Sequence, residues 1–571
     1  MKNILSPIFA IAGSPTIAKR LSERFSKSSL YFAIMEEPWT QRHDAENEVK
    51  SRNNLLAYFD ADHEWLILAG CSEKTLDMFK TIFSPAYWQK RIIVIKNENE
   101  IDKLIAPLVT YAVNEKQEDL LISHRDIFKL TPADTVAVIE SSNSLGEIIA
   151  LNLSRAKGYK ILKVNSPSRE EVDEFEDLLR DWNSGYQIAR DNLFLRLRDK
   201  LGSLEKTSVG KIIFFTRGLP YGVLPFKCPV AHMMQERDLG LQILRGIWRE
   251  NKQAAIATAF LCDPGHFEKS EFENVKNDLE AHGVSIIALH GKDASNHRFI
   301  HTIEWYPYDF ALISSHAGEV RGRKITEEFD GSDGKKHEII YDLFASFSGR
   351  FIDGKTMVQE MTVPISIDGI RWGENKVIPP SVLKDYFFER QEDRLKRKPK
   401  KTEACSGVKY SNALQMHDFT WIPAMQIVGE ERHPIIFNNA CASWLQMGGL
   451  FVWAGASAYI GTSKNIAASM AKECSEKFVH QSLRKGTILQ ALHNAQKEYA
   501  TGLGYSPYLF WGFPDLTMSS VYVNSSLIRR RRITRSIAYW QRQELKLQGK
   551  EKTKYKAIHQ CLEEVDRLTS V

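Results

Sequence analysis

Two reactive side chains in the sequence each follow an apolar run and stand among small residues. His316 follows the run in FALISSHAGE, and Cys441 follows the run in PIIFNNACASW. A free cysteine is mostly protonated at neutral pH, and a neighbouring imidazole can accept its proton. If the two runs are neighbouring parallel strands, their carboxyl ends open onto one crevice. The pair therefore predicts thiol catalysis, with His316 as the general base and Cys441 as the nucleophile.

Each residue taken alone also has a structural explanation. A cysteine at a strand end is usually a small buried hydrophobic residue, and a single histidine is usually structural. The combination favours catalysis but does not define the reaction. Asp263 and His266 in CDPGHF follow another strand pattern and are a second candidate for the same crevice. An ordinary turn is the simpler interpretation of that segment.

The elements that must position this pair alternate between strand and helix patterns, which indicates an α/β fold with parallel sheets. Residues 1–168 are predicted to form an N-terminal Rossmann-like α/β domain that senses or recruits another molecule. Its expected strands are SPIFAIAG, SLYFAIM, EWLILAG, RIIVIKN, DTVAVIES and YKILKVN. Its expected helices include PTIAKRLSERF and SLGEIIALNLSRA.

The rest of the chain is divided into a connector, a second α/β domain and a tail. Residues 169–208 carry Leu, Phe and Ile at helical spacing and are predicted to form a helical connector. Residues 209–524 are the second α/β domain, which contains His316 and Cys441. Residues 525–571 are predicted to be a basic helical tail, in which the run from Arg529 to Arg532 is expected on a solvated face.

A β-rich insertion is expected at about residues 319–432 of the second domain. GRKITEEFDGSDGKKHEIIYDLF has the pattern of a hairpin, and GKTMVQEMTVPISIDGIRW has that of a further strand. The stretch from Glu389 to Gly407 is rich in Lys and Arg and contains Pro399. So much like charge cannot be buried, so we expect an exposed loop. Because exposed loops are preferred sites of nicking, this stretch is a candidate for autoprocessing, with a passive solvated loop as the alternative.

Composition argues against a nucleic-acid-binding, metal-binding, secreted or membrane-spanning protein. The 571 residues allow about three or four domains, and the net charge of +5 does not favour a dedicated nucleic-acid binder. The seven cysteines form no CxxC pair and no zinc-spaced Cys/His cluster, so no metal or other cofactor is expected. The apolar run from Ile8 to Ala12 is too short for a signal peptide, and no stretch approaches the roughly 20 apolar residues of a membrane span. We therefore expect a cytoplasmic protein without a membrane partner.

Six motifs, in this order, resemble those of the CHAT family of caspase-like, separase-related cysteine peptidases (clan CD). They are LPYGVLPF, LISSHAG, PIIFNNACAS, GASAYIGTSKNI, KGTILQALHNAQ and YLFWGFPDLTM. Each motif is short and mostly apolar, but their order over about half of the chain is specific. The resemblance implies a caspase-like fold for residues 209–524. It also implies cleavage of protein substrates at a defined side chain, often in bacterial defence against viruses or in programmed death.

Carried over to this sequence, the resemblance gives His316 the role of base and Cys441 that of nucleophile. It implies an oxyanion hole built from the backbone amides of Ala317, Gly318 and Cys441. The chain departs from the family pattern at Ala317, since many relatives have Gly directly after the histidine. Cys441 also follows His316 by 125 residues, against about 50 in caspases. The β-rich insertion accounts for the longer spacing.

Two alternatives remain open at the level of sequence. One is a non-catalytic caspase-like scaffold, against which the retained His/Cys pair argues. The other is a receptor for a nucleotide-type signal, suggested by the extra N-terminal α/β domain. A peptidase gated by an activating ligand or partner at that domain combines both ideas, and deletion of residues 1–168 is the corresponding test.

Overall fold

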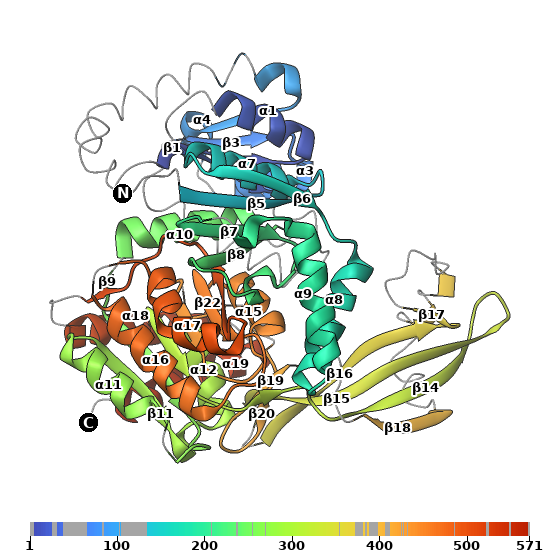
Figure 1. The fold of residues 1–571 in the computed structure, drawn as a ribbon, viewed down its shortest axis with the longest axis vertical. Coiled ribbons are helices and arrows are strands. Elements are labelled where there is room, and N and C mark those ends of the chain that lie inside the picture. The colour runs from blue at the N-terminus through green and yellow to red at the C-terminus, as the bar shows by residue number, and fades with distance from the viewer. Residues whose placement is uncertain are drawn as a thin grey trace.

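The computed structural model covers most of the chain. It describes residues 5–25, 31–37, 65–82, 85–101, 103, 105, 134–206, 208–235, 238–253, 255–268, 270–352, 355–371, 381–382, 385–386, 398–405, 412–423, 425, 427–430, 432–484, 486–520, 525–546 and 550–568. The fold is of the α/β class, as the alternating patterns predict, with helices packed around parallel sheets (Figure 1).

A small parallel sheet lies at the N-terminal end of the molecule, in the order β2-β1-β3-β4 (Figure 1). Its strands are β1 (Leu5–Ala12), β2 (Tyr31–Glu36), β3 (Trp65–Ala69) and β4 (Ile92–Ile95). Helices α1 (Pro15–Phe25), α3 (Glu73–Ile82) and α4 (Pro85–Arg91) connect them. These strands correspond to four of the six apolar runs predicted for the first third of the chain, and α1 corresponds to PTIAKRLSERF.

A second sheet of ten strands forms the centre of the molecule, in the order β11-β10-β12-β21-β22-β23-β8-β7-β5-β6. All neighbours are parallel except β22 and β23. The strands are β5 (Thr135–Ser141), β6 (Lys160–Asn165), β7 (Lys211–Thr216), β8 (Val230–Met234), β10 (Thr258–Asp263), β11 (Ser285–His290), β12 (Phe310–Ile313), β21 (Ile435–Asn438), β22 (Ala458–Thr462) and β23 (Tyr508–Gly512).

Both faces of the large sheet are buried along its central strands, whereas the edge strand β6 is largely exposed. On β7, Ile213 and Phe215 belong to an apolar cluster that continues into the N-terminal sheet. Ile212 and Phe214, which point the other way, belong to a separate cluster on the opposite face. Strands covered on both faces have continuous apolar runs rather than alternating ones. This explains the sequence pattern from which they were predicted.

The predicted domain boundary at residue 168 needs correction. Strands β5 and β6 lie N-terminal to it, yet β5 pairs in parallel with β7 and β6 pairs with β5. The pattern of a βαβ unit indicates that its two strands are parallel, but it does not indicate which sheet they join. Deletion of residues 1–168 would therefore remove two strands of the ten-stranded sheet, so it does not separate two domains.

Two helices lie between the sheets and join them. Helix α7 (Leu145–Ala156) contacts both α1 and β2, and α10 (Leu239–Gln253) contacts β2 and α7. The carboxylate of Glu36, at the end of β2, accepts hydrogen bonds of 2.8 and 3.1 Å from the backbone amides of Leu239 and Gly240. A carboxylate at a helix N-terminus satisfies amides that have no partner within the helix. The N-terminal sheet therefore holds the first turn of α10 directly.

Further helices pack on the large sheet or on the helices that cover it (Figure 1). They are α8 (Arg169–Asn183), α9 (Gln187–Leu201), α11 (Phe272–Ala281), α12 (Asn296–Trp305), α15 (Leu445–Trp453), α16 (Ala468–Ser482), α17 (Ile488–Leu503), α18 (Ser525–Lys546) and α19 (Lys550–Leu568). Helices α8 and α9 confirm the helical character predicted for residues 169–208. They bury Phe175, Leu179 and Trp182 of α8 in the cluster on one face of the large sheet.

The insertion between His316 and Cys441 is β-rich, as predicted. Its main part is an antiparallel sheet, β17-β16-β15-β14-β18, which extends to one side as an arm (Figure 1). The strands are β14 (Gly322–Asp330), β15 (Lys336–Ile352), β16 (Lys355–Ile367), β17 (Ile370–Arg371) and β18 (Lys401–Cys405). β14 and β15 form the predicted hairpin. Shorter pairings join β13 (Ala317–Gly318), β19 (Ala413–Gln415) and β20 (Thr420–Trp421), and β9 (Ala255–Ile256) with β24 (Ser519–Ser520).

The prediction of an exposed loop from Glu389 to Gly407 is corrected in part. Lys401–Cys405 form β18, which pairs with β14 at the edge of the arm. An edge strand keeps its charged side chains in solvent, so a basic composition is compatible with a strand there. Residues 389–397 and 406–407 lie outside the described residues.

The C-terminal tail is helical, as predicted, but its arginine run is not simply solvated. Helices α18 and α19 pack against each other, and α19 contacts α12. The guanidinium of Arg529 donates to the carbonyl of Ile286, and that of Arg532 bonds the buried carboxylate of Asp309. The tail is therefore docked on the large sheet. Among the described residues, no helix has the length and apolar character needed to cross a membrane.

Candidate active site

The predicted catalytic residues emerge side by side from two neighbouring parallel strands. β12 pairs with β21, and Ile313 at the end of β12 lies opposite Asn438 at the end of β21. His316 and Cys441 each come three residues beyond this last pair. In this half of the sheet the strand order is β11-β10-β12-β21-β22. The chain runs from β10 to β11 in one direction across the sheet, and then places β12, β21 and β22 on the other side of β10. Crevices at the carboxyl ends of strands beside such a change are where ligands bind in open α/β sheets.

His316 and Cys441 line the same cavity, which has a volume of about 260 Å³. Its walls come from the loops after β10, β12, β21 and β22 and from the start of α16. The lining residues are Phe267, Ser270, Glu271, Ser314, Ser315, His316, Asn439, Cys441, Ile466, Ala468 and Ala471.

Local backbone bonds hold both turns in place. The amide of Ser314 donates to the carbonyl of Cys262 on β10, and that of Asn439 donates to Ile313 on β12, each at 2.8 Å. These bonds continue the sheet pairing past the strand ends. Ala442 then takes a positive φ of 49°, a conformation that is costly for a residue with a side chain. The chain therefore turns sharply after Cys441, which leaves the thiol at the edge of the sheet.

His316 is exposed on one side and faces two aromatic rings on the other. Its ring centroid lies 4.7 Å from that of Phe267 and 5.3 Å from that of His266. Partial burial, and then the neighbouring His266, lower the pKa of His316 below its usual value. The imidazole is therefore neutral at pH 7 and able to accept a proton, as a general base must be.

The loop after β10 supplies these neighbours of His316. His266 Nε2 lies 3.0 Å from the carbonyl oxygen of Gln415, so Nε2 is the nitrogen that carries the hydrogen. Asp263 accepts a hydrogen bond of 2.8 Å from the amide of Gly265 and thus shapes the turn. Of the second candidate pair, His266 contacts His316. Asp263 instead stabilises an ordinary turn, the simpler of the two interpretations of this segment.

Cys441 is half-buried, and its Sγ lies 3.9 Å from the carbonyl oxygen of Ile466. Of the three residues predicted to form the oxyanion hole, only Cys441 lines the cavity. Ala317 and Gly318 instead form the short strand β13, opposite Leu414 and Ala413 of β19. The insertion returns alongside the histidine turn and pairs with it. This pairing was not visible in the sequence because β19 lies about 100 residues away.

A buried carboxyl group in the cavity wall was missed by the sequence analysis. Glu271 is 3% exposed, and its carboxylate accepts a 2.5 Å hydrogen bond from Asn439 Nδ2. Tyr508 in turn donates its hydroxyl hydrogen to Asn439 Oδ1. Burial raises the pKa of Glu271 above its ordinary value, although the bonds from Asn439 and Ser314 oppose the shift.

Asn439 could have been recognised as a candidate site residue from the sequence, but Glu271 could not. Asn439 stands two residues before Cys441 at a strand end, a position that could have been noted. Glu271 lies in the charged stretch EKSEF, where nothing in the sequence distinguishes a buried carboxylate from an exposed one.

The end of α8 contacts loops on both sides of the cavity. The guanidinium of Arg180 forms a 2.7 Å ion pair with Glu319, three residues after His316. The side-chain oxygen of Asn183 accepts a 2.8 Å hydrogen bond from the amide of Asn465, next to the cavity residue Ile466. The helical connector therefore braces the two loops that flank the candidate site.

Comparison of the chain with models of known protein families and with curated proteins gives no match. The resemblance to CHAT peptidases therefore rests on the six sequence motifs. Among the described residues, no group of three or more His, Cys, Asp and Glu side chains is arranged to hold a metal ion.

The influence of His266 on His316 leads to a first prediction. Replacing His266 by Gln removes the neighbouring imidazole that opposes protonation of His316, so the pKa of His316 should rise. NMR titration of labelled histidine in a Cys441→Ala background measures this pKa, and the signal is assigned with His316→Gln. The exposed residue His480 provides the control substitution His480→Gln, which should leave the titration unchanged. An unchanged or lower pKa of His316 in His266→Gln would contradict the electrostatic account.

Proposed function

We propose that the chain is a cysteine endopeptidase of the caspase-like CHAT type, in which His316 and Cys441 form the catalytic dyad. The observation that supports this most strongly is the matched position of the two residues. Each lies three residues beyond a paired position of adjacent strands, and both line one cavity. The motif resemblance implies a regulated effector of bacterial defence or programmed death, and the sequence composition favours the cytoplasm as its location.

The reaction follows from the roles of the two side chains. His316 accepts the thiol proton of Cys441, and the thiolate attacks the carbonyl carbon of a substrate peptide bond. The backbone amide of Cys441 donates a hydrogen bond to the developing oxyanion. The C–N bond breaks as His316 returns the proton to the departing amine, which leaves a thioester on Cys441. A water molecule, deprotonated by His316, then hydrolyses the thioester and regenerates the thiol.

The cavity beside Cys441 suggests which side chain the substrate presents. Apolar walls from Phe267, Ile466 and Ala471 surround it, and Glu271 adds a buried carboxyl group. A long basic side chain suits both parts, since its aliphatic stem packs against apolar walls while its cationic end pairs with a carboxylate. We therefore propose cleavage after Arg or Lys.

Gating by the N-terminal sheet stays part of the proposal. Its physical route would be α10, whose first turn is held by Glu36. Burial, then the neighbouring Asp238, raises the pKa of Glu36 to about 8, while the two helix amides oppose the shift. A ligand that displaced β2 would therefore move a helix that also packs on the ten-stranded sheet.

Removal of either member of the dyad should abolish peptide cleavage. In Cys441→Ala and in His316→Ala, we expect kcat to fall by at least about a thousandfold, with little change in folding. The double variant should be no worse than the single ones, because the two residues act as a unit. Cleavage of a protein or peptide library by purified protein, followed by mass spectrometry of the new termini, measures this. Cleavage that persists in Cys441→Ala would refute the assignment.

The role of Glu271 is tested by an isosteric change. Glu271→Gln keeps an oxygen that accepts the hydrogen bond from Asn439 but removes the negative charge. We expect kcat/KM for peptides with Arg or Lys at the cleavage site to fall at least about tenfold. Because the pKa of Glu271 is raised, kcat/KM of the wild type for these peptides should increase as pH rises through that pKa.

The exposed neighbour Glu268 provides the matched control for this experiment. Glu268→Gln removes a negative charge from the same loop but not from the cavity wall, so it should have little effect. If Glu271→Gln and Glu268→Gln show the same preference among Arg, Lys and Gln peptides, Glu271 does not select the substrate.

A further inference from the structure

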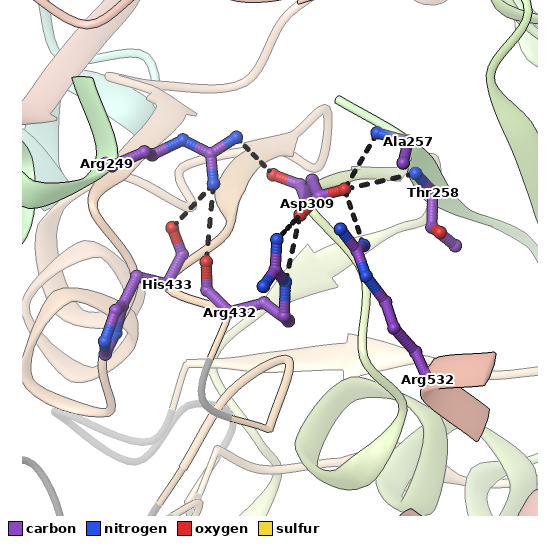
Figure 2. A network of polar contacts seen from close by, with 7 residues as sticks. All are labelled: Arg249, Ala257, Thr258, Asp309, Arg432, His433 and Arg532. Atoms are coloured by element: carbon purple, nitrogen blue, oxygen red, sulfur yellow. Dashed lines mark hydrogen bonds and ion pairs between the residues drawn. The ribbon is translucent and has the colours of Figure 1, made fainter. Parts of the chain in front are cut away.

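One buried carboxylate lies at the amino ends of the strands that carry the candidate dyad. Asp309 immediately precedes β12, is fully buried and is surrounded by three arginines (Figure 2). Arg432 bonds Asp309 Oδ1 through Nε and Nη2, at 3.2 and 2.9 Å. Arg532 bonds Oδ2 at 2.9 Å. Burial alone would raise the pKa of Asp309, but the guanidiniums of Arg432, Arg532 and Arg249 hold it well below its ordinary value.

This carboxylate ties three adjacent strands together. Oδ2 also accepts hydrogen bonds of 2.9 and 3.2 Å from the amides of Ala257 and Thr258, at the start of β10. Arg432 comes from the residues just before β21, so its ion pair joins the amino ends of β12 and β21. The backbone of Asp309 is bonded to the same neighbours, since its amide donates to Thr258 and its carbonyl accepts from Ile435.

Arg249 reinforces the same junction from helix α10. Its Nη2 donates to the carbonyl of Asp309 at 2.9 Å, and its Nη1 donates to the carbonyl of His433 at 3.0 Å (Figure 2). It therefore bridges the backbone before β12 to the backbone before β21. Arg249 is itself fully buried. Burial lowers its pKa to about 10, which leaves it charged at pH 7.

So much buried charge is not needed to stabilise a fold. Buried ion pairs are often no more stabilising than apolar residues of similar size, but removing one partner is costly because the other remains unpaired. Their best-supported use is to specify one arrangement of elements over others. Here the arrangement they specify is the relative position of β10, β12 and β21.

We infer that Asp309 is a positioning residue for catalysis, through which Arg432, Arg249 and Arg532 hold His316 and Cys441 at a fixed separation. This inference rests on the proposed function of the dyad and adds to it a control point at the opposite end of the strands. Asp309 is seven residues before His316, and Arg432 is nine residues before Cys441.

Little in the intervening structure can absorb a shift of one strand against the other. β12 and β21 have only four residues each, and all eight side chains are at most 1% exposed. Packed interiors of this kind transmit displacements because they contain few voids. A strand moved at its amino end therefore moves the turn at its carboxyl end. An error of about 1 Å between reacting groups can cost about a hundredfold in rate.

Through Arg532, the C-terminal tail contacts the carboxylate of Asp309. Arg532 lies on α18, which is also held by a 2.8 Å hydrogen bond from Ser536 to Glu430 and by the packing of Trp540 on Trp305. The tail thereby completes the set of charges around Asp309 from outside the sheet. Docking of the tail and the geometry of the dyad are thus linked.

The test is to replace Arg532 by Met and to measure both peptide cleavage and the rate at which iodoacetamide alkylates Cys441. We expect kcat to fall about tenfold or more, KM to change less than about twofold, and alkylation of Cys441 to slow by a factor similar to that for kcat. Arg532→Lys, which keeps the charge, should lie between Arg532→Met and the wild type. Arg531→Met, on the exposed side of the same helix, should match the wild type.

A merely structural role would give a different result. In that case Arg532→Met would lower the unfolding temperature but leave kcat and the alkylation rate at 25 °C equal to those of Arg531→Met, which would overturn the inference. A change confined to KM would overturn it as well. Asp309→Asn should show a larger loss of kcat than Arg532→Met if the variant folds. If Arg532→Met does not fold, Arg532→Lys takes its place in the same comparison with Arg531→Met.

The two proposals fail separately. If the wild type cleaves no peptide, the proposed function fails, but alkylation of Cys441 still reports whether Arg532 controls the dyad. If Arg532→Met cleaves as fast as Arg531→Met, the positioning role fails while the peptidase assignment stands.

Discussion

The parallel pairing of β12 with β21 is the constraint on which the candidate site depends. Because Ile313 lies opposite Asn438, two residues 125 positions apart in the chain leave the sheet at the same level. The long insertion between them does not disturb this pairing, since its antiparallel arm forms a sheet of its own. β19, from the same insertion, lies beside the turn that follows His316.

The charges around Asp309 and the side chains of the cavity lie at opposite ends of the same strands. At the amino ends, helix α10 and tail helix α18 each contribute an arginine. At the carboxyl ends, α8 braces the two flanking loops through Arg180 and Asn183. Three helices that are far apart in the sequence, α8, α10 and α18, thus contact the ends of these two short strands or the loops beside them.

Much of this arrangement could be predicted from the sequence, because burial on both faces gives a strand a continuous apolar run. Apolar runs indicated the strands, helical spacing indicated the main helices, and a turn sequence indicated the hairpin of the insertion. His316 and Cys441, each predicted after such a run, line one cavity. The membership of β5 and β6 in the larger sheet was not indicated, since local patterns carry no information on distant partners. Asp309 and Glu271 were missed for a related reason: a buried carboxylate is recognised by its partners, and those partners are remote in sequence.

The central claim is that His316 activates Cys441, and the relative reactivity of the seven free cysteines tests it most directly. Brief treatment of the native protein with iodoacetamide, followed by quantitative mass spectrometry, gives a rate for each. Cys71 and Cys405 are also half-buried and serve as internal references, and burial together with Glu37 raises the pKa of Cys71 to about 12. The account predicts that Cys441 reacts fastest in the wild type and loses this advantage in His316→Ala. A Cys441 that reacts no faster than Cys405, or at the same rate with and without His316, would contradict it.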